Sequence, residues 1–134
     1  MAAIAPLVLA DGQASPANKT FTPMDCTSQL ATWTDRSSGI ALGMPSVTLS
    51  VVSKSGQPSK ITGKVSLPVM EVISGADGGY TPSPKVAYTC IGKVELTFPD
   101  RSTLQNRKDT RAFVKNLLLD TVIQKAVEEF ERPY

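Results

Sequence analysis

The 134-residue sequence contains no histidine, and only 19% of its residues are charged. Histidine is the commonest general base and a common zinc ligand, so its absence excludes Ser-His-Asp triads, histidine-based zinc proteases and most pH switches. The chain also lacks a run of about twenty apolar residues, which a membrane-spanning helix requires. Enzymes of the common classes are therefore disfavoured, and we expect no membrane partner.

Cysteine is scarce as well. Cys26 and Cys90 lie far apart and form no disulfide framework, so we expect reduced thiols. Cys90 falls on the apolar side of a predicted strand and is interpreted as a buried small hydrophobic residue. The first ten residues are apolar but lack the basic start and cleavage site of a signal peptide. We interpret them as a strand and expect a soluble, intracellular protein.

The sequence pattern changes near residue 100. Residues 1–99 contain short β-rich runs separated by clusters of Gly, Pro, Ser and Asp, whereas residues 100–134 contain no glycine and have their apolar residues at helical spacing. Strands followed by helices predict an α+β fold with an antiparallel sheet covered on one face, rather than a βαβ fold. The length fits a single domain over 1–134.

Two helices are predicted in the last 35 residues. Asp100, Ser102 or Thr103 can cap the first. The second is predicted to begin near residue 120 or 121, with an apolar stripe that includes Phe130, and to end at Pro133.

Alternation along the strands assigns side chains to faces. Residues 47–51, 60–67 and 85–98 place apolar side chains on one side and mainly Thr, Ser and Lys on the other, and 27–35 does so more weakly. Gly63 and Gly92 fall on the apolar side, where a helix could approach closely or a bulge could form. The polar side carries Leu30, Thr32, Thr34, Thr48, Ser50, Lys60, Thr62, Lys64, Ser66, Thr89, Ile91, Lys93, Glu95 and Thr97.

The polar side is also basic, although the formal net charge is only +2. No acidic residue occurs between Asp35 and Glu71, a stretch that contains four basic residues. Such a face can be an ordinary solvated surface, or it can be a platform whose hydroxyl and ammonium groups hold phosphates and base edges. Neither a catalytic constellation nor metal-ligand spacing is present, so we expect no cofactor and no metal.

Several segments in order resemble the coat proteins of the small single-stranded RNA bacteriophages, the levivirus group. They are Val47–Val51 (VTLSV), Thr62–Pro68 (TGKVSLP), Glu95–Pro99 (ELTFP), Arg111–Val114 (RAFV) and the terminal Pro-Tyr. The resemblance covers the chain from about Asp25 onward. It implies an N-terminal β-hairpin, a five-stranded antiparallel sheet and two C-terminal helices that clasp a second subunit, giving an interlocked dimer with a ten-stranded sheet.

The resemblance also implies a function. Residues 1–99 would form the hairpin and sheet, and 100–134 the dimer clasp. The homodimers would assemble into an icosahedral shell that packages the single-stranded RNA genome against the inner sheet face. That face would also bind an operator-like RNA hairpin and repress replicase translation. The protein would occur in the virion, and in the host bacterial cytoplasm during assembly.

Family positions that bind RNA match particular residues of this chain. An adenine pocket is implied at Thr48, Ser50, Thr62 and Lys64, with Leu30 beside it. Relatives often have a basic residue at the position of Val52, a stacking aromatic at that of Ile91, and Asn or Asp at that of Lys93. These differences bear on which RNA hairpin is bound, not on RNA binding itself. The complete predicted RNA-binding set is Leu30, Thr48, Ser50, Lys60, Thr62, Lys64, Lys93 and Glu95.

The segment 73–84 matches the loop that surrounds the symmetry axes of the shell. It has no cysteine, so we expect a shell without disulfide cross-links. Gly75, Gly78 and Gly79 would allow the several conformations that quasi-equivalent positions require. A second hypothesis is a cellular sheet-plus-helix RNA-binding regulatory dimer that does not assemble further; the size of the particle distinguishes the two.

Overall fold

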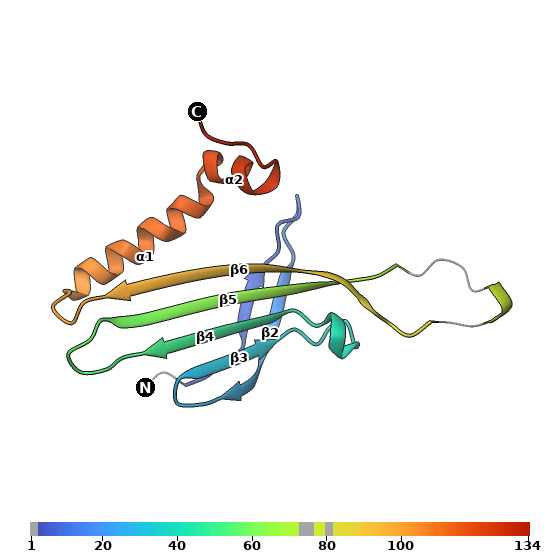
Figure 1. The fold of residues 1–134 in the computed structure, drawn as a ribbon, viewed down its shortest axis with the longest axis horizontal. Helices are drawn as coiled ribbons and strands as arrows, with labels where there is room; N and C mark the ends of the chain where they lie inside the picture. The colour runs from blue at the N-terminus through green and yellow to red at the C-terminus, as the bar shows by residue number, and fades with distance from the viewer. Residues whose placement is uncertain (1–2, 73–76, 80–81) are drawn as a thin grey trace.

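The computed structural model describes residues 3–72, 77–79 and 82–134. Within them the chain forms one six-stranded antiparallel sheet whose strands are neighbours in sequence order, followed by two helices (Figure 1). The strands are β1 (Leu7–Ala10), β2 (Asn18–Cys26), β3 (Leu30–Thr34), β4 (Ser46–Val52), β5 (Ser59–Met70) and β6 (Val86–Phe98). The helices are α1 (Leu104–Leu119) and α2 (Thr121–Glu128), and short 3-10 turns occur at Ala41–Gly43 and Asp77–Gly79.

Strand β2 belongs to both the N-terminal hairpin and the main sheet. Its first half pairs with β1, with Phe21 opposite Leu7, and its second half pairs with β3, with Thr22 opposite Thr34. The register shifts between Pro23 and Asp25. The predicted hairpin and five-stranded sheet are therefore confirmed, with one continuous strand serving both.

Few apolar residues of the described chain are buried. Phe21 in β2 and Trp33 in β3 lie where the hairpin meets the main sheet, whereas Phe98 ends β6. The indole N–H of Trp33 donates to the carbonyl oxygen of Ala5 over 2.8 Å, which ties the N-terminal segment to β3. Trp33 thus points away from the polar face, as its alternation predicts.

Both helices begin at side-chain caps. Thr103 accepts from the N–H of Asn106 over 3.2 Å, and Asp120 accepts from the N–H of Val122 over 2.9 Å. The predicted end of the second helix at Pro133 is wrong, because α2 ends at Glu128 and Phe130 has a left-handed backbone with φ 56°. A left-handed residue cannot continue an α-helix, so the helix ends before the proline.

The prediction that the helices cover the apolar sheet face does not hold within one chain. Among the described residues neither helix packs against a strand of its own chain. After β6 the chain turns into α1, which projects away from the sheet (Figure 1). A Cβ built on Gly63 or Gly92 would meet nothing within 4 Å, so no helix approaches these glycines. Cys90, predicted to be buried, is exposed for the same reason.

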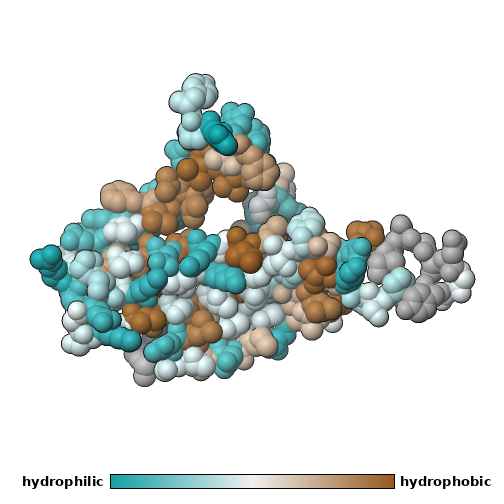
Figure 2. Space-filling model, viewed as in Figure 1, coloured by the Kyte–Doolittle hydropathy of each residue, from teal (hydrophilic) through white to brown (hydrophobic). Residues whose placement is uncertain are grey.

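Large apolar surfaces are consequently open to solvent. Leu67 on the sheet is 47% exposed and Phe113 on α1 is 72% exposed. Figure 2 shows hydrophobic side chains gathered over the helices and open space between them and the sheet. The accessible surface is 10641 Å², whereas a compact monomer of this mass exposes about 6,800 Å². The excess is far larger than the roughly 800 Å² that each partner contributes to a standard protein interface.

None of the described helices is both long enough and apolar enough to cross a lipid bilayer.

Candidate nucleic-acid interface

The strand register brings the predicted RNA-binding residues together in two adjacent rows across the sheet. Side chains directly opposite on neighbouring strands lie about 5 Å apart, so each row is a continuous surface. The first row is Thr32, Thr48, Lys64 and Lys93, and the second is Leu30, Ser50, Thr62 and Glu95. A third row contains Val52, Lys60 and Thr97, with Lys60 in the middle. All eight predicted residues therefore lie on one connected patch, which we call the polar face.

The polar face combines short hydroxyl groups with longer charged side chains. Thr48, Ser50 and Thr62 are half-buried within the sheet, whereas Lys64 and Lys93 are exposed. Leu30 is 43% exposed at the end of its row. Hydroxyls can both donate to and accept from base edges, and ammonium groups attract phosphate. The face can therefore contact both parts of a nucleotide.

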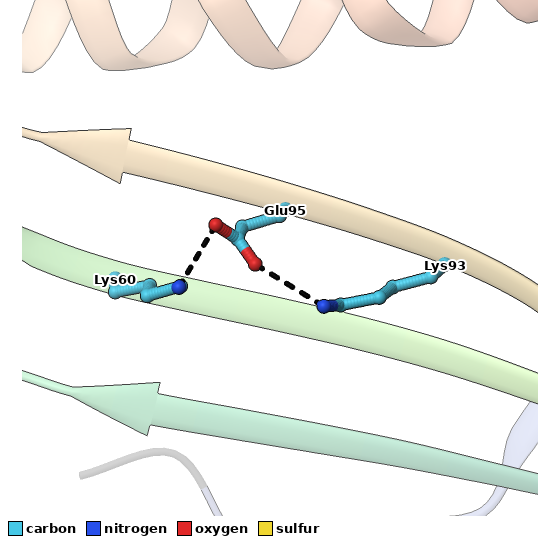
Figure 3. A network of polar contacts seen from close by, with 3 residues as sticks. All are labelled: Lys60, Lys93 and Glu95. Carbon is cyan, nitrogen blue, oxygen red and sulfur yellow. Dashed lines mark ion pairs between the residues drawn. The ribbon is translucent and has the colours of Figure 1, made fainter.

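Glu95 lies between two lysines on the polar face, at the β6 end of the second row (Figure 3). Its Oε1 is 2.9 Å from Nζ of Lys60, and its Oε2 is 3.4 Å from Nζ of Lys93. The hydrogen bond from Lys60, helped by Lys93, holds the pKa of the Glu95 carboxyl below its ordinary value. Lys64 forms no ion pair with any described residue, so its charge remains available to a ligand.

Removing the Glu95 charge should strengthen RNA binding. In Glu95→Gln the two neighbouring lysines lose their counter-charge, and we expect about five-fold tighter binding of single-stranded RNA at low salt, since unit charges a few ångströms apart in water interact by about 1 kcal/mol. The wild-type protein should gain this affinity only when the pH falls below the lowered pKa of Glu95, and the variant should not respond there. Fluorescence titrations at several pH values check this, and an unchanged or weaker affinity of the variant at neutral pH would contradict it.

Thr32 and Thr97 also belong to this surface, although they were not in the predicted set. Thr32 lies opposite Thr48, and Thr97 lies opposite Lys60. Alternation within each strand places both on the polar side, but only the register between strands shows which side chains are their neighbours. Ile91, 61% exposed opposite Ser66, continues the face beyond the first row.

The described part of the polar face has no aromatic side chain in its three rows, which limits base stacking. Among the described residues no cluster of three or more acidic or cysteine side chains could hold a metal ion. The fold and this face together define a class of subunit: one face of the sheet is polar and basic, and the opposite apolar face is left uncovered by the helices of the same chain.

Comparisons with known proteins identify the class more closely. The levivirus coat protein family model matches residues 2–134. The virus-like particle of bacteriophage NT-214 has a subunit 34% identical over 99% of this chain and 100% of its own, with a TM-score of 0.90. The particle of bacteriophage ESE058 matches at 27% identity with the same coverage and TM-score.

A more distant match is described as an unassembled virus coat protein dimer, a bacteriophage RNA-binding dimer. It is 18% identical, covers 96% of both chains and has a TM-score of 0.67, so it supports the fold alone. No curated protein matches the chain. The family model spans nearly the whole sequence, and the chain therefore belongs to the levivirus coat protein family. The predicted resemblance is confirmed.

Proposed function

We propose that this coat protein forms homodimers that assemble into an icosahedral shell around single-stranded viral RNA. The relatives NT-214 and ESE058, both solved as virus-like particles, support the shell-forming role. In this proposal the protein is a component of the virion and assembles in the cytoplasm of the host bacterium. The exposed surface of 10641 Å² is the observation that carries the proposal, because a single chain this open needs a partner.

Dimerisation would use two surfaces. In the described residues β6 pairs only with β5, so its second edge is free to pair with β6 of another copy and join two five-stranded sheets into ten strands. The exposed helices would extend over the apolar face of that other copy. Both the open strand edge and the open apolar face would then be covered by one partner.

The polar face would contact the RNA from inside the shell. Thr48, Ser50, Thr62 and Lys64 would surround an adenine base, with Leu30 beside it. Lys60 and Lys93 would approach phosphates, in competition with Glu95, with which both form ion pairs. Binding of a hairpin in the viral RNA at this face would repress translation of the replicase. A distant relative with the same fold is described as an RNA-binding dimer.

The loop predicted to surround the symmetry axes lies partly outside the described residues, and Gly75 falls in the undescribed part. Gly78 and Gly79 have φ values of 85° and 76°, which favour glycine. We propose that the glycines let this loop adopt different conformations at different shell positions. The shell would form without disulfide cross-links, since the loop contains no cysteine.

Particle size tests the proposed function. After expression in bacteria the protein should elute from a size-exclusion column far ahead of a dimer, and electron microscopy should show closed shells. A protein that remained dimeric over a wide range of salt and protein concentration would contradict the capsid role. That outcome would favour a cellular RNA-binding regulatory dimer instead.

A further inference from the structure

One polar contact joins the helical segment 99–134 to the sheet of its own chain in the described structure. The carboxylate Oδ2 of Asp100 accepts a hydrogen bond from the backbone N–H of Gly56 over 3.1 Å. Every other hydrogen bond of this segment among the described residues lies within the segment, and none of their ion pairs involves it. Because the helices do not pack against the strands, this bond and the chain itself determine how α1 leaves the sheet.

Gly56 lies in the turn between β4 and β5, and that turn does not use its backbone N–H. The N–H of Gln57 donates to the carbonyl oxygen of Lys54 over 3.1 Å and closes the turn. Gly56 is the third residue and has a φ of 75°, the pattern of a type II turn, which favours glycine. At the base of the turn the hydroxyls of Ser53 and Ser59 are 2.9 Å apart. The turn is therefore held by its own hydrogen bonds, and the N–H of Gly56 is available to another segment.

Asp100 lies in a second turn, between β6 and α1, at the same end of the sheet (Figure 1). The N–H of Ser102 donates to the carbonyl oxygen of Pro99 over 2.9 Å and closes this turn. Thr103 caps α1, so Asp100, one of the three predicted caps, is not the cap. Its carboxylate bonds to the β4–β5 turn instead, and the two turns line a common groove.

We infer that Asp100 is a positioning residue for the helical clasp, because its hydrogen bond to the β4–β5 turn fixes the direction in which α1 leaves the sheet. The inference rests on the proposed dimer, in which the helices reach the sheet of a second copy. A carboxylate accepts a stronger hydrogen bond than a neutral group does. Without this bond α1 would sample other directions in the free chain, and the loss of that freedom would be a cost of association.

Substitutions in the full-length protein test this role. Asp100→Ala should raise the dimer dissociation constant by about ten-fold, the scale of one hydrogen bond to a charged group. Asp100→Asn should stay within about three-fold of the wild type, because its amide oxygen can accept the same bond. Ser53→Ala is the matched control, since it removes a hydrogen bond of the same turn that does not involve the helical segment, and it should leave the constant unchanged. Analytical ultracentrifugation over a dilution series measures the constants.

Exchange of single backbone amide hydrogens, followed by NMR in the dimer, reports on the bond itself. The Gly56 amide should be protected in the wild type and should exchange about ten-fold faster in Asp100→Ala. The Gln57 amide, which closes the turn, should keep its rate. This pair of amides separates loss of the bond to Asp100 from opening of the turn.

A wild-type dissociation constant of Asp100→Ala would overturn the inference. Weakening by Asp100→Asn or by Ser53→Ala as large as that by Asp100→Ala would also overturn it, because charge or turn stability would then explain the effect. Unprotected exchange of the Gly56 amide in the wild-type dimer would overturn it without any variant. These results leave the coat-protein function intact, whereas failure of the wild-type protein to dimerise would overturn the proposed function.

Discussion

A chain that ends at Leu119 should no longer form a soluble dimer. The truncation removes α2 and its apolar side chains, which in the proposed dimer cover the sheet of the other copy. That sheet face includes residues that are 37–47% exposed in the single chain, such as Leu49 and Leu67. With α2 missing, the part of this surface that it covers should drive aggregation, since monomeric proteins rarely expose large continuous apolar patches. Sedimentation of the soluble fraction after expression measures the result.

A chain lacking only Pro133 and Tyr134 is the matched control, and it should dimerise normally because α2 is intact. A soluble, monodisperse monomer ending at Leu119 would contradict the helix clasp, because it would show that the exposed sheet face needs no cover. A stable dimer of the same truncated chain would contradict the need for α2, since β6 pairing and α1 would then suffice.

Substitutions on the polar face should weaken RNA binding in two distinguishable ways. Lys64→Ala should lower the affinity for an RNA hairpin with unpaired adenines by about ten-fold or more, on the scale of a hydrogen bond to a charged group. It should also reduce the log-log salt slope by about 0.7 if Lys64 neutralises one phosphate of a single strand. Thr48→Ala should lower the affinity by about five-fold without changing the slope, because a hydroxyl carries no charge.

Lys85→Ala provides the control for a lost positive charge. Lys85 pairs with Glu71 over 3.6 Å outside the rows of the polar face, and exposed pairs of this kind contribute little. All variants should remain dimeric. Wild-type affinity of both Lys64→Ala and Thr48→Ala in a filter-binding or fluorescence titration would remove these residues from the RNA site.

Strand faces were the part of the fold most accessible from the sequence. Alternating side chains assign Thr48 and Lys64 to one face and Leu49 and Val65 to the other, and the structure has the same assignment. The start of the first helix at Thr103, one of three predicted caps, and the start of the second near residue 120 also follow from local signals, whereas the N-terminal hairpin was expected from the family resemblance. These features depend on residues close together in the chain, and local patterns encode them well.

Features that depend on distant residues or on a second chain were harder to predict. The pairing of Lys60 and Lys93 with Glu95 depends on strand register, which alternation does not specify. The burial predicted for Cys90 assumed that helices of the same chain cover the sheet, whereas in the structure they do not. Apolar periodicity shows which face needs a cover but not which chain supplies it.

The central claim is that this coat protein encloses RNA in a shell, and the absorbance spectrum of the assembled particle tests it most directly. The chain contains one tryptophan and three tyrosines, so the protein itself absorbs weakly. After expression in bacteria and nuclease treatment, the void-volume peak of a size-exclusion column should absorb more strongly at 260 nm than at 280 nm, because nuclease-protected RNA dominates the spectrum. A void-volume peak of closed shells with a protein spectrum, or no such peak at all, would contradict the account.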